Sequence, residues 1–114
     1  MTPWQPLTQA EQLSEIVRES AGQPVIVFKH STTCSISAMA KSKIERQWAD
    51  AGLENAKLYY LDLLNYRPIS QELAQQFKVQ HESPQLLLIQ DGACTYHASH
   101  NGIRLSDVKQ AAAK

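Results

Sequence analysis

Cys34 is the residue of this 114-residue chain whose sequence context most favours chemistry. It follows the apolar segment Val25–Phe28, which has the composition of a buried strand, and it precedes a helical pattern. The first N–H groups of a helix have no partner within the helix, and together with the helix dipole they stabilise negative charge. We therefore expect the Cys34 thiolate, which is the form that attacks disulfides, to be favoured there, with Lys29 and His30 adding positive potential.

The spacing of the cysteines limits the thiol chemistry that is available. The three residues after Cys34 are Ser35, Ile36 and Ser37, so the chain lacks the Cys-x-x-Cys pair with which a dithiol oxidoreductase releases its own mixed disulfide. The second cysteine, Cys94, lies sixty positions further along the sequence. A mixed disulfide at Cys34 must then be released by a small-molecule thiol or by Cys94, and the sequence favours a monothiol cycle.

Cys94 is predicted to be structural or incidental rather than a resolving cysteine. It lies directly after a hairpin turn, and strict alternation along its strand places it on the same face as Tyr96 and Ala98. A resolving cysteine is expected instead in a loop close to the nucleophile. The histidines do not form a compact cluster with zinc-type spacing, so no metal site is predicted.

The elements around Cys34 alternate between helical and strand patterns. A capping-box pattern of Thr8 and Glu11 predicts the start of the first helix. The Asp91–Gly92 dipeptide predicts a two-residue hairpin turn. The remaining elements are strands at Val25–Phe28, Leu58–Leu61, Gln85–Gln90 and Ala93–Ala98, and helices from Cys34 to about Ala51, from Pro68 to about Lys78, and over Ser106–Ala112.

This order of elements is typical of a thioredoxin-like α/β fold. We expect one domain over residues 1–114, with a central mixed β-sheet of about four strands flanked by helices. In the helix after Cys34, the residues Ile36, Ala40, Ile44 and Trp48 recur every four positions, and we predict that all of them pack in the core and carry no function.

A second functional segment is expected where Ser83 and Pro84 precede a strand. A proline can begin a strand without breaking its hydrogen-bond ladder. In a thioredoxin-like sheet this proline is typically cis and its loop faces the cysteine, which leaves backbone groups at Ser83 free to pair with an extended peptide or a thiol.

Charge and hydropathy exclude other classes of protein. Eleven basic and eleven acidic residues are interspersed, so nucleic-acid binding is not expected. The longest apolar runs have four residues, against about 20 that are needed to cross a bilayer. The segment Met1–Ala10 does not have the pattern of a secretory signal, and we expect a cytoplasmic protein whose thiols are reduced.

Three motifs resemble those of one family, the YtxJ-type monothiol bacilliredoxins. They are the segments FKHSTTCSIS at residues 28–37, HESPQ at 81–85 and HASH at 97–100. The resemblance implies a thioredoxin-like protein that removes bacillithiol, a low-molecular-weight thiol, from mixed disulfides on oxidised cytoplasmic proteins. Bacillithiol is then a co-substrate, and no tightly bound cofactor is implied. Two positions depart from the family pattern: Ser35 replaces a proline, and Asn101 replaces an aromatic residue.

The hypothesis is that Cys34 attacks the mixed disulfide, that Thr33 and Ser35 supply hydrogen bonds, and that Ser83 and Pro84 orient the substrate. Two alternatives stay open at the level of sequence. In the first, Cys94 resolves Cys34 internally. In the second, the chain is a thioredoxin-like binding module that holds a peptide at the Pro84 loop without redox turnover.

Overall fold

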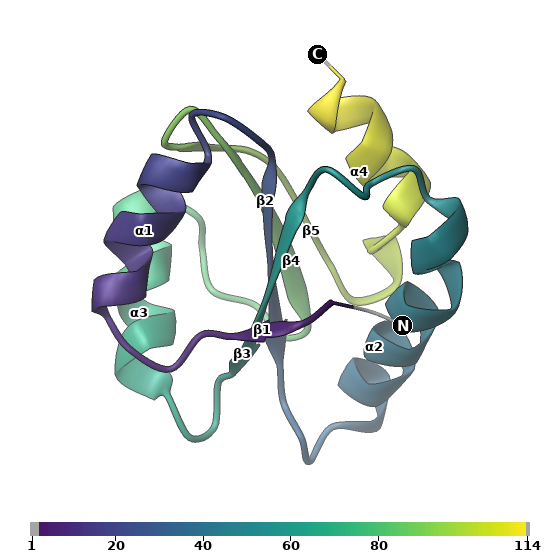
Figure 1. The fold of residues 1–114 in the computed structure, drawn as a ribbon. Helices are drawn as coiled ribbons and strands as arrows, with labels where there is room; N and C mark the ends of the chain where they lie inside the picture. Colours follow the sequence, from purple (N-terminus) through teal and green to yellow (C-terminus); the bar gives the residue numbers. More distant parts are fainter. Residues whose placement is uncertain (1–2, 114) are drawn as a thin grey trace.

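The computed structural model describes residues 3–113 and shows a β-sheet between two layers of helices (Figure 1). The strands are β1 (Gln5–Pro6), β2 (Val25–His30), β3 (Lys57–Asp62), β4 (Gln85–Gln90) and β5 (Ala93–Ser99). The helices are α1 (Glu11–Glu19), α2 (Ser35–Gln47), α3 (Arg67–Phe77) and α4 (Leu105–Ala112), with short 3₁₀ turns η1 (Trp48–Asp50) and η2 (His100–Gly102).

The sheet has the strand order β1-β3-β2-β4-β5. β2 lies at its centre, parallel to β3 and antiparallel to β4, so the sheet is mixed as predicted. β1 is an additional strand of two residues that pairs in parallel with β3. Leu7, the residue after β1, donates its N–H to the carbonyl of Tyr60 in β3. So short a strand, half of it proline, has no alternating pattern by which the sequence could reveal it.

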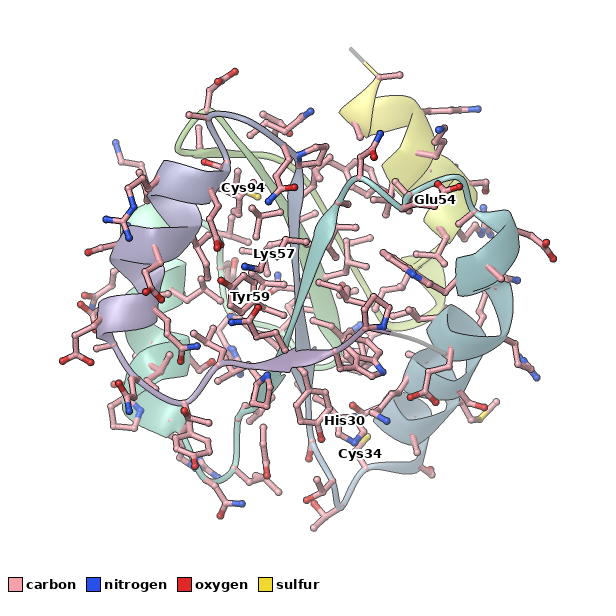
Figure 2. All side chains as sticks on the ribbon, viewed as in Figure 1. His30, Cys34, Glu54, Lys57, Tyr59 and Cys94 are labelled. Carbon is pink, nitrogen blue, oxygen red and sulfur yellow. The ribbon has the colours of Figure 1, made fainter. Side chains whose placement is uncertain are left out.

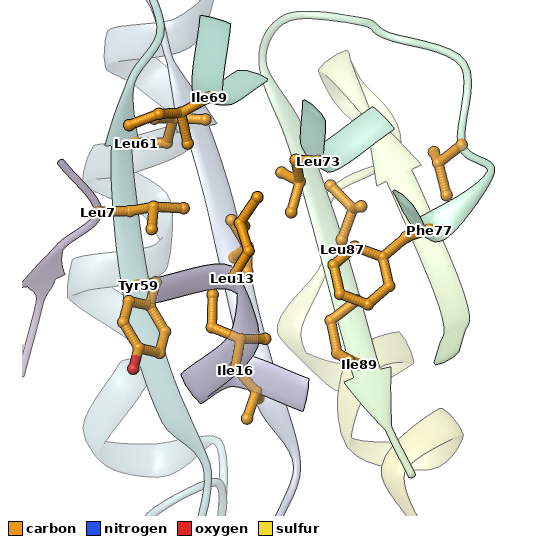
Figure 3. Close-up of a cluster of buried hydrophobic side chains, with 13 residues drawn as sticks. Leu7, Leu13, Ile16, Tyr59, Leu61, Ile69, Leu73, Phe77, Leu87 and Ile89 are labelled. Atoms are coloured by element: carbon orange, nitrogen blue, oxygen red, sulfur yellow. The ribbon is translucent and has the colours of Figure 1, made fainter. Parts of the chain in front are cut away.

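Two hydrophobic clusters hold the layers together. α1 and α3 cover one face of the sheet and α2 and α4 cover the other (Figure 1). Figure 3 shows the first cluster, in which Leu13 and Ile16 of α1 and Leu73 of α3 pack on Leu87 and its neighbours. Successive residues of β2 alternate between the clusters, since Val27 belongs to the first and Phe28 to the second. Adjacent residues at the end of β2 therefore face opposite layers.

The start of α1 differs from the prediction. The helix begins at Glu11, and the Thr8 side chain does not cap it. The side-chain oxygen of Gln12 instead accepts hydrogen bonds from the backbone N–H groups of Thr8 and Gln9, at 2.8 and 3.0 Å. The expected capping box is wrong because a longer side chain within the helix satisfies the free N–H groups.

The predicted hairpin and the predicted boundaries of α3 are confirmed. Asp91 and Gly92 have φ values of 52° and 79°, and they join β4 to β5. Pro68 lies in the first turn of α3, and the helix ends at Lys78, whose φ of 57° is left-handed.

A β-bulge overturns the predicted orientation of Cys94. Leu88 pairs with Tyr96, but the next residue, Ile89, pairs with Cys94, so Thr95 is an extra residue in β5. Tyr96 consequently packs on the α2 and α4 side, whereas Cys94 packs on the α1 and α3 side. The prediction assumed unbroken alternation, which the extra residue removes.

The predicted apolar stripe of α2 is only partly buried. Ala40 and Ile44 lie in the core and Trp48 is half-buried, but the Ile36 side chain is 49% exposed. Residues four apart turn by about 40° relative to each other, so a stripe at constant four-residue spacing drifts off the buried face. Ser37 is buried in the first turn instead.

Candidate active site

Cys34 forms the junction between β2 and α2. It is the N-cap residue of the 13-residue helix α2, and its extended backbone (φ −107°, ψ 121°) leads into the helix. Its N–H donates to the carbonyl of Ser31 at 3.2 Å, and its carbonyl accepts the N–H of Ala38 at 3.0 Å. The thiol is free and half-buried. A sulfur in this place lies beside the free N–H groups of the first helical turn.

A buried serine anchors the first turn of α2 to the end of β2. Ser37 is fully buried, and its Oγ lies 2.7 Å from Nδ1 of His30 and 3.0 Å from the backbone nitrogen of Ser31. Since the Ser31 N–H donates to this oxygen, the Ser37 hydroxyl proton is free to point at Nδ1. The neutral His30 imidazole then carries its proton on Nε2.

His30 does not supply the positive potential that the sequence led us to expect. Its ring is buried next to Phe28 and Tyr60, with centroid distances of 5.9 and 5.5 Å. Burial, and then the charge of Lys41, lower the pKa of His30 below its usual value, although Asp62 offsets part of this. The imidazole is therefore neutral near pH 7.

Lys29 faces the opposite layer from His30. It is fully buried on the α1 and α3 side, and its Nζ lies 3.2 Å from Nδ1 of His81. Burial lowers the pKa of Lys29 to about 8. The same region lowers the pKa of His81, first by burial and then by the charges of Lys29 and Arg67. The Lys29 side chain contacts His81. Although Lys29 is close to Cys34 in the sequence, its ammonium group therefore lies in the other layer and not beside the thiol.

The loop before β4 reaches the same end of the sheet as Cys34. Gln85 pairs with Lys29 near the end of β2, and the preceding Ser83–Pro84 peptide bond is cis, as predicted. The Pro84 carbonyl accepts the N–H of His100 at 3.1 Å, which ties η2 to this loop. The Ser99 hydroxyl and the Glu82 carboxylate add a second tie between β5 and the loop.

The Ser83 hydroxyl has an unmet hydrogen-bonding capacity. Among residues 3–113, two buried side-chain oxygens have no hydrogen-bond partner within the protein: Ser83 Oγ and Asp62 Oδ1. Both lie at the end of the sheet where Cys34 is. Asp62 pairs with His30, the last residue of β2, and Ser83 precedes Gln85, which pairs with Lys29. A buried polar atom without a partner costs stability, and a ligand can satisfy it.

The structure thus places all seven predicted site residues at one end of the sheet, and two of them point into the helical layers. Thr33 and Ser35 are exposed on either side of Cys34, and Ser83 and Pro84 approach from the neighbouring strand. The other two, Lys29 and His30, end β2 at this edge but face opposite layers.

Cys94 lies at the other end of the molecule. It pairs with Ile89, which pairs with Val25 at the start of β2, whereas Cys34 follows His30 at the end of that strand. The five residue steps from Val25 to His30 span about 16 Å, and Figure 2 shows the two cysteines at opposite ends of the sheet. A disulfide needs Cα atoms within about 7 Å, so internal resolution of Cys34 by Cys94 does not fit this fold.

The sequence of this chain matches a known protein family over almost its whole length. The profile described as monothiol bacilliredoxin BrxC matches residues 5–108, which is nearly the whole chain. The chain belongs to the monothiol bacilliredoxin family. The resemblance seen in the three sequence motifs is thereby confirmed.

Solved structures confirm the thioredoxin-like fold of this bacilliredoxin. A protein with a thioredoxin fold, provisionally described as an oxidoreductase, is 29% identical, with a TM-score of 0.82 and coverage of 96% of this chain and 93% of that one. Thioredoxin f from spinach chloroplast is 16% identical, with a TM-score of 0.75 and coverage of 97% and 87%. Fasciola hepatica thioredoxin is 17% identical, with a TM-score of 0.69 and coverage of 96% of each chain. The last two show a likeness of fold alone.

The described part of the chain contains neither a cluster of metal ligands nor a membrane-spanning helix. Within residues 3–113, histidine, cysteine and carboxylate side chains do not gather in groups of three or more that could hold a metal ion. None of the helices in this part of the chain is both long and apolar enough to cross a membrane.

Two features of the candidate site were not predicted from the sequence. The first is Ser37, which occupies the fourth position of the absent Cys-x-x-Cys motif and anchors His30. That position was a signal, because it marks the residue that faces the sheet from the first helical turn. The second is the exposed pair Ile36 and Met39, 49% and 71% exposed: Ile36 was predicted to lie in the core, and no prediction was made for Met39.

Proposed function

We propose that this protein is a monothiol thiol-disulfide oxidoreductase that removes bacillithiol, or a similar low-molecular-weight thiol, from protein mixed disulfides through Cys34. The observation that carries the proposal is a free, half-buried thiol at the N-cap of α2, with Ser37 one helical turn further on where a dithiol enzyme has its second cysteine. Such a thiol can accept a thiol group from a substrate but cannot release it alone.

The first step transfers the small thiol from the client protein to Cys34. The Cys34 thiolate attacks the bacillithiol sulfur, a new S–S bond forms to Cys34, and the bond between bacillithiol and the client sulfur breaks. The client leaves as a thiolate and takes a proton from water. The exchange leaves the number of disulfides and thiols unchanged.

The second step regenerates Cys34. A second bacillithiol, as its thiolate, attacks the bacillithiol sulfur that is bound to Cys34. The Cys34 thiolate leaves, and the two small thiols become a symmetrical disulfide, so the small-thiol pool supplies the two electrons that reduce the client. Rates of this chemistry depend on the thiolate fraction and the nucleophilicity of the attacking sulfur.

Ser83 and Pro84 are proposed to orient the incoming disulfide, with Thr33 and Ser35 as hydrogen-bond partners. Support comes from the cis Ser83–Pro84 bond, from the buried and unpartnered Ser83 Oγ, and from the exposure of Thr33 and Ser35. An extended substrate segment beside Ser83 can satisfy backbone groups as an added strand does. The proposed partners are S-thiolated proteins of a reducing cytoplasm.

The test is release of the modified client. Purified protein is incubated with a bacillithiolated client and with the same client carrying glutathione, and release is followed by mass spectrometry. We expect release of bacillithiol by the wild type and by Cys94→Ser, and none by Cys34→Ser. If Cys34→Ser releases the client at the wild-type rate, the proposal is wrong. If the protein holds the client equally well after Cys34 is alkylated and releases nothing, it is a binding module.

A further inference from the structure

A hollow of about 560 Å³ lies between α2 and η2, next to the proposed site. Its lining includes Ile36 and Met39, which are the two large hydrophobic side chains that are exposed among residues 3–113. It also includes the cations Lys43, Arg46 and Arg104. Within the part of the chain that the structure describes, its lining residues include no carboxylate. The α2–η2 groove is thus apolar near one end and positively charged further along.

The walls of the groove are held in place and are continuous with the site. Lys43 Nζ donates to the carbonyl of Ile103 at 3.1 Å and so joins α2 to the segment after η2. The Pro84 carbonyl accepts the N–H of His100, which joins η2 to the loop before β4. The groove begins at Ile36, two residues after Cys34. A molecule bound at Cys34 can therefore continue directly into it.

The length of the groove favours a polypeptide over a small thiol. Ten helical residues separate Ile36 from Arg46, which corresponds to about 15 Å along α2. An extended chain covers that length with four or five residues at about 3.3 Å each. A second hollow shares Arg46 and continues between α2 and α4. Together the two hollows follow α2 along most of its length, which suits an extended chain.

We propose that the α2–η2 groove binds an acidic segment of the S-thiolated client. An apolar client residue near the modified cysteine contacts Ile36 and Met39, and aspartate or glutamate residues four or five positions away face Arg46 and Arg104. This inference rests on the proposed function, because it names the feature by which that activity selects its clients. Charge complementarity of this kind sets specificity and association rate.

The test uses two peptide disulfides that differ only in charge. Each peptide carries a bacillithiolated cysteine, a leucine and, four positions on, either Glu-Asp-Glu or Lys-Arg-Lys. The groove variant Arg46→Gln/Arg104→Gln is compared with a control of equal net charge, Arg18→Gln/Lys78→Asn. The control changes two exposed residues on the other side of the sheet, one in α1 and one directly after α3. Asn is chosen because it tolerates the left-handed backbone of Lys78.

We expect the wild type and the control to release the acidic peptide at least about fivefold faster than the basic one, and the groove variant to lose this preference. Equal rates for both peptides in the wild type overturn the proposal. An equal loss on both peptides in the groove variant also overturns it, since the cations then bind the small thiol. A dimer that protects Met39 from oxidation overturns it in favour of a second copy.

A binding measurement separates this inference from the proposed function. Fluorescent forms of the two peptides without the disulfide are titrated with the Cys34→Ser protein. Tighter binding of the acidic peptide, lost in the groove variant, supports the groove even if the wild type releases no bacillithiol. Equal binding of both peptides overturns the groove while leaving a measured release activity intact.

Discussion

The hydroxyl of Ser37 lies 2.7 Å from Nδ1 of His30, and this contact joins the first turn of α2 to the last residue of β2. The same oxygen accepts the N–H of Ser31, in the connection that carries Cys34. One buried hydroxyl therefore fixes both sides of the loop that presents the thiol. In a dithiol enzyme this position is taken by the resolving cysteine, so here a structural group stands in place of a reactive one.

Ser37→Ala is expected to destabilise the fold by about 1–3 kcal/mol, because the Ser31 N–H and His30 Nδ1 lose their partner without contact with water. Urea denaturation measures this loss. The matched control is Ser42→Ala, at an exposed position of the same helix, which should change the free energy of unfolding by no more than about 0.5 kcal/mol. Equal denaturation midpoints for the two variants contradict the anchoring role.

Cys94 is expected to react at least about tenfold more slowly than Cys34 with iodoacetamide at pH 7.5. Burial raises the pKa of the Cys94 thiol, and its Sγ donates to the Tyr96 carbonyl at 3.3 Å. Mass mapping of labelled peptides measures both rates in one sample. A Cys34–Cys94 disulfide in folded, diamide-treated protein is the result that contradicts the separation of the two thiols.

The sequence predicted those parts of the structure that depend on local pattern. The β-branched run of β2, the Asp91–Gly92 turn and Pro68 in the first turn of α3 each have one favoured conformation, and each was confirmed. The same holds for Cys34 at the start of a helix. The position of Cys34 follows from the strand-to-helix transition alone.

What the sequence did not reveal depends on contacts between distant segments. The face of the sheet on which Cys94 lies depends on one extra residue in β5, and the pairing of β5 with β4 determines where that residue is inserted. The environment of Lys29 depends on His81, which lies 52 positions away in the sequence. The burial of Ser37 in the first turn of α2, where the sequence predicted Ile36 in the core, depends on its contacts with His30 and Ser31. Alternation and periodicity contain no information about such partners.

Lys29→Met is expected to change how stability depends on pH. Burial lowers the pKa of Lys29 from 10.5 to about 8, so between these values the unfolded chain binds more protons than the folded one. Wild-type stability gains from this group as pH rises through that window, and the full effect is about 3 kcal/mol. The stability of Lys29→Met relative to wild type should therefore fall by up to this amount between pH 8 and 10.5.

Urea denaturation at intervals of pH measures this difference for Lys29→Met. Lys109→Met removes an exposed lysine and is the matched control, whose pH dependence is subtracted. A difference between Lys29→Met and wild type that stays constant from pH 7 to 10.5 contradicts the assigned burial of an ammonium group.

Ser35 offers a direct test of how the helix N-terminus acts on Cys34. It is the first residue of α2, where proline fits the helix but lacks an N–H. Ser35→Pro removes one N–H from the group beside the sulfur, whereas Ser35→Ala keeps the N–H and removes only the hydroxyl. If the first-turn N–H groups stabilise the thiolate, iodoacetamide capture by Cys34 at pH 7 should slow about two- to fivefold in Ser35→Pro.

Capture by Ser35→Ala should stay within about twofold of wild type, because its backbone donors are intact. Circular dichroism of both variants verifies that α2 is preserved. If the alanine variant slows as much as the proline variant, the hydroxyl rather than the backbone N–H stabilises the Cys34 thiolate. If capture slows in neither variant, Ser35 does not stabilise the Cys34 thiolate. Any contribution of the helix N-terminus must then come from the N–H groups of Ile36 and Ser37.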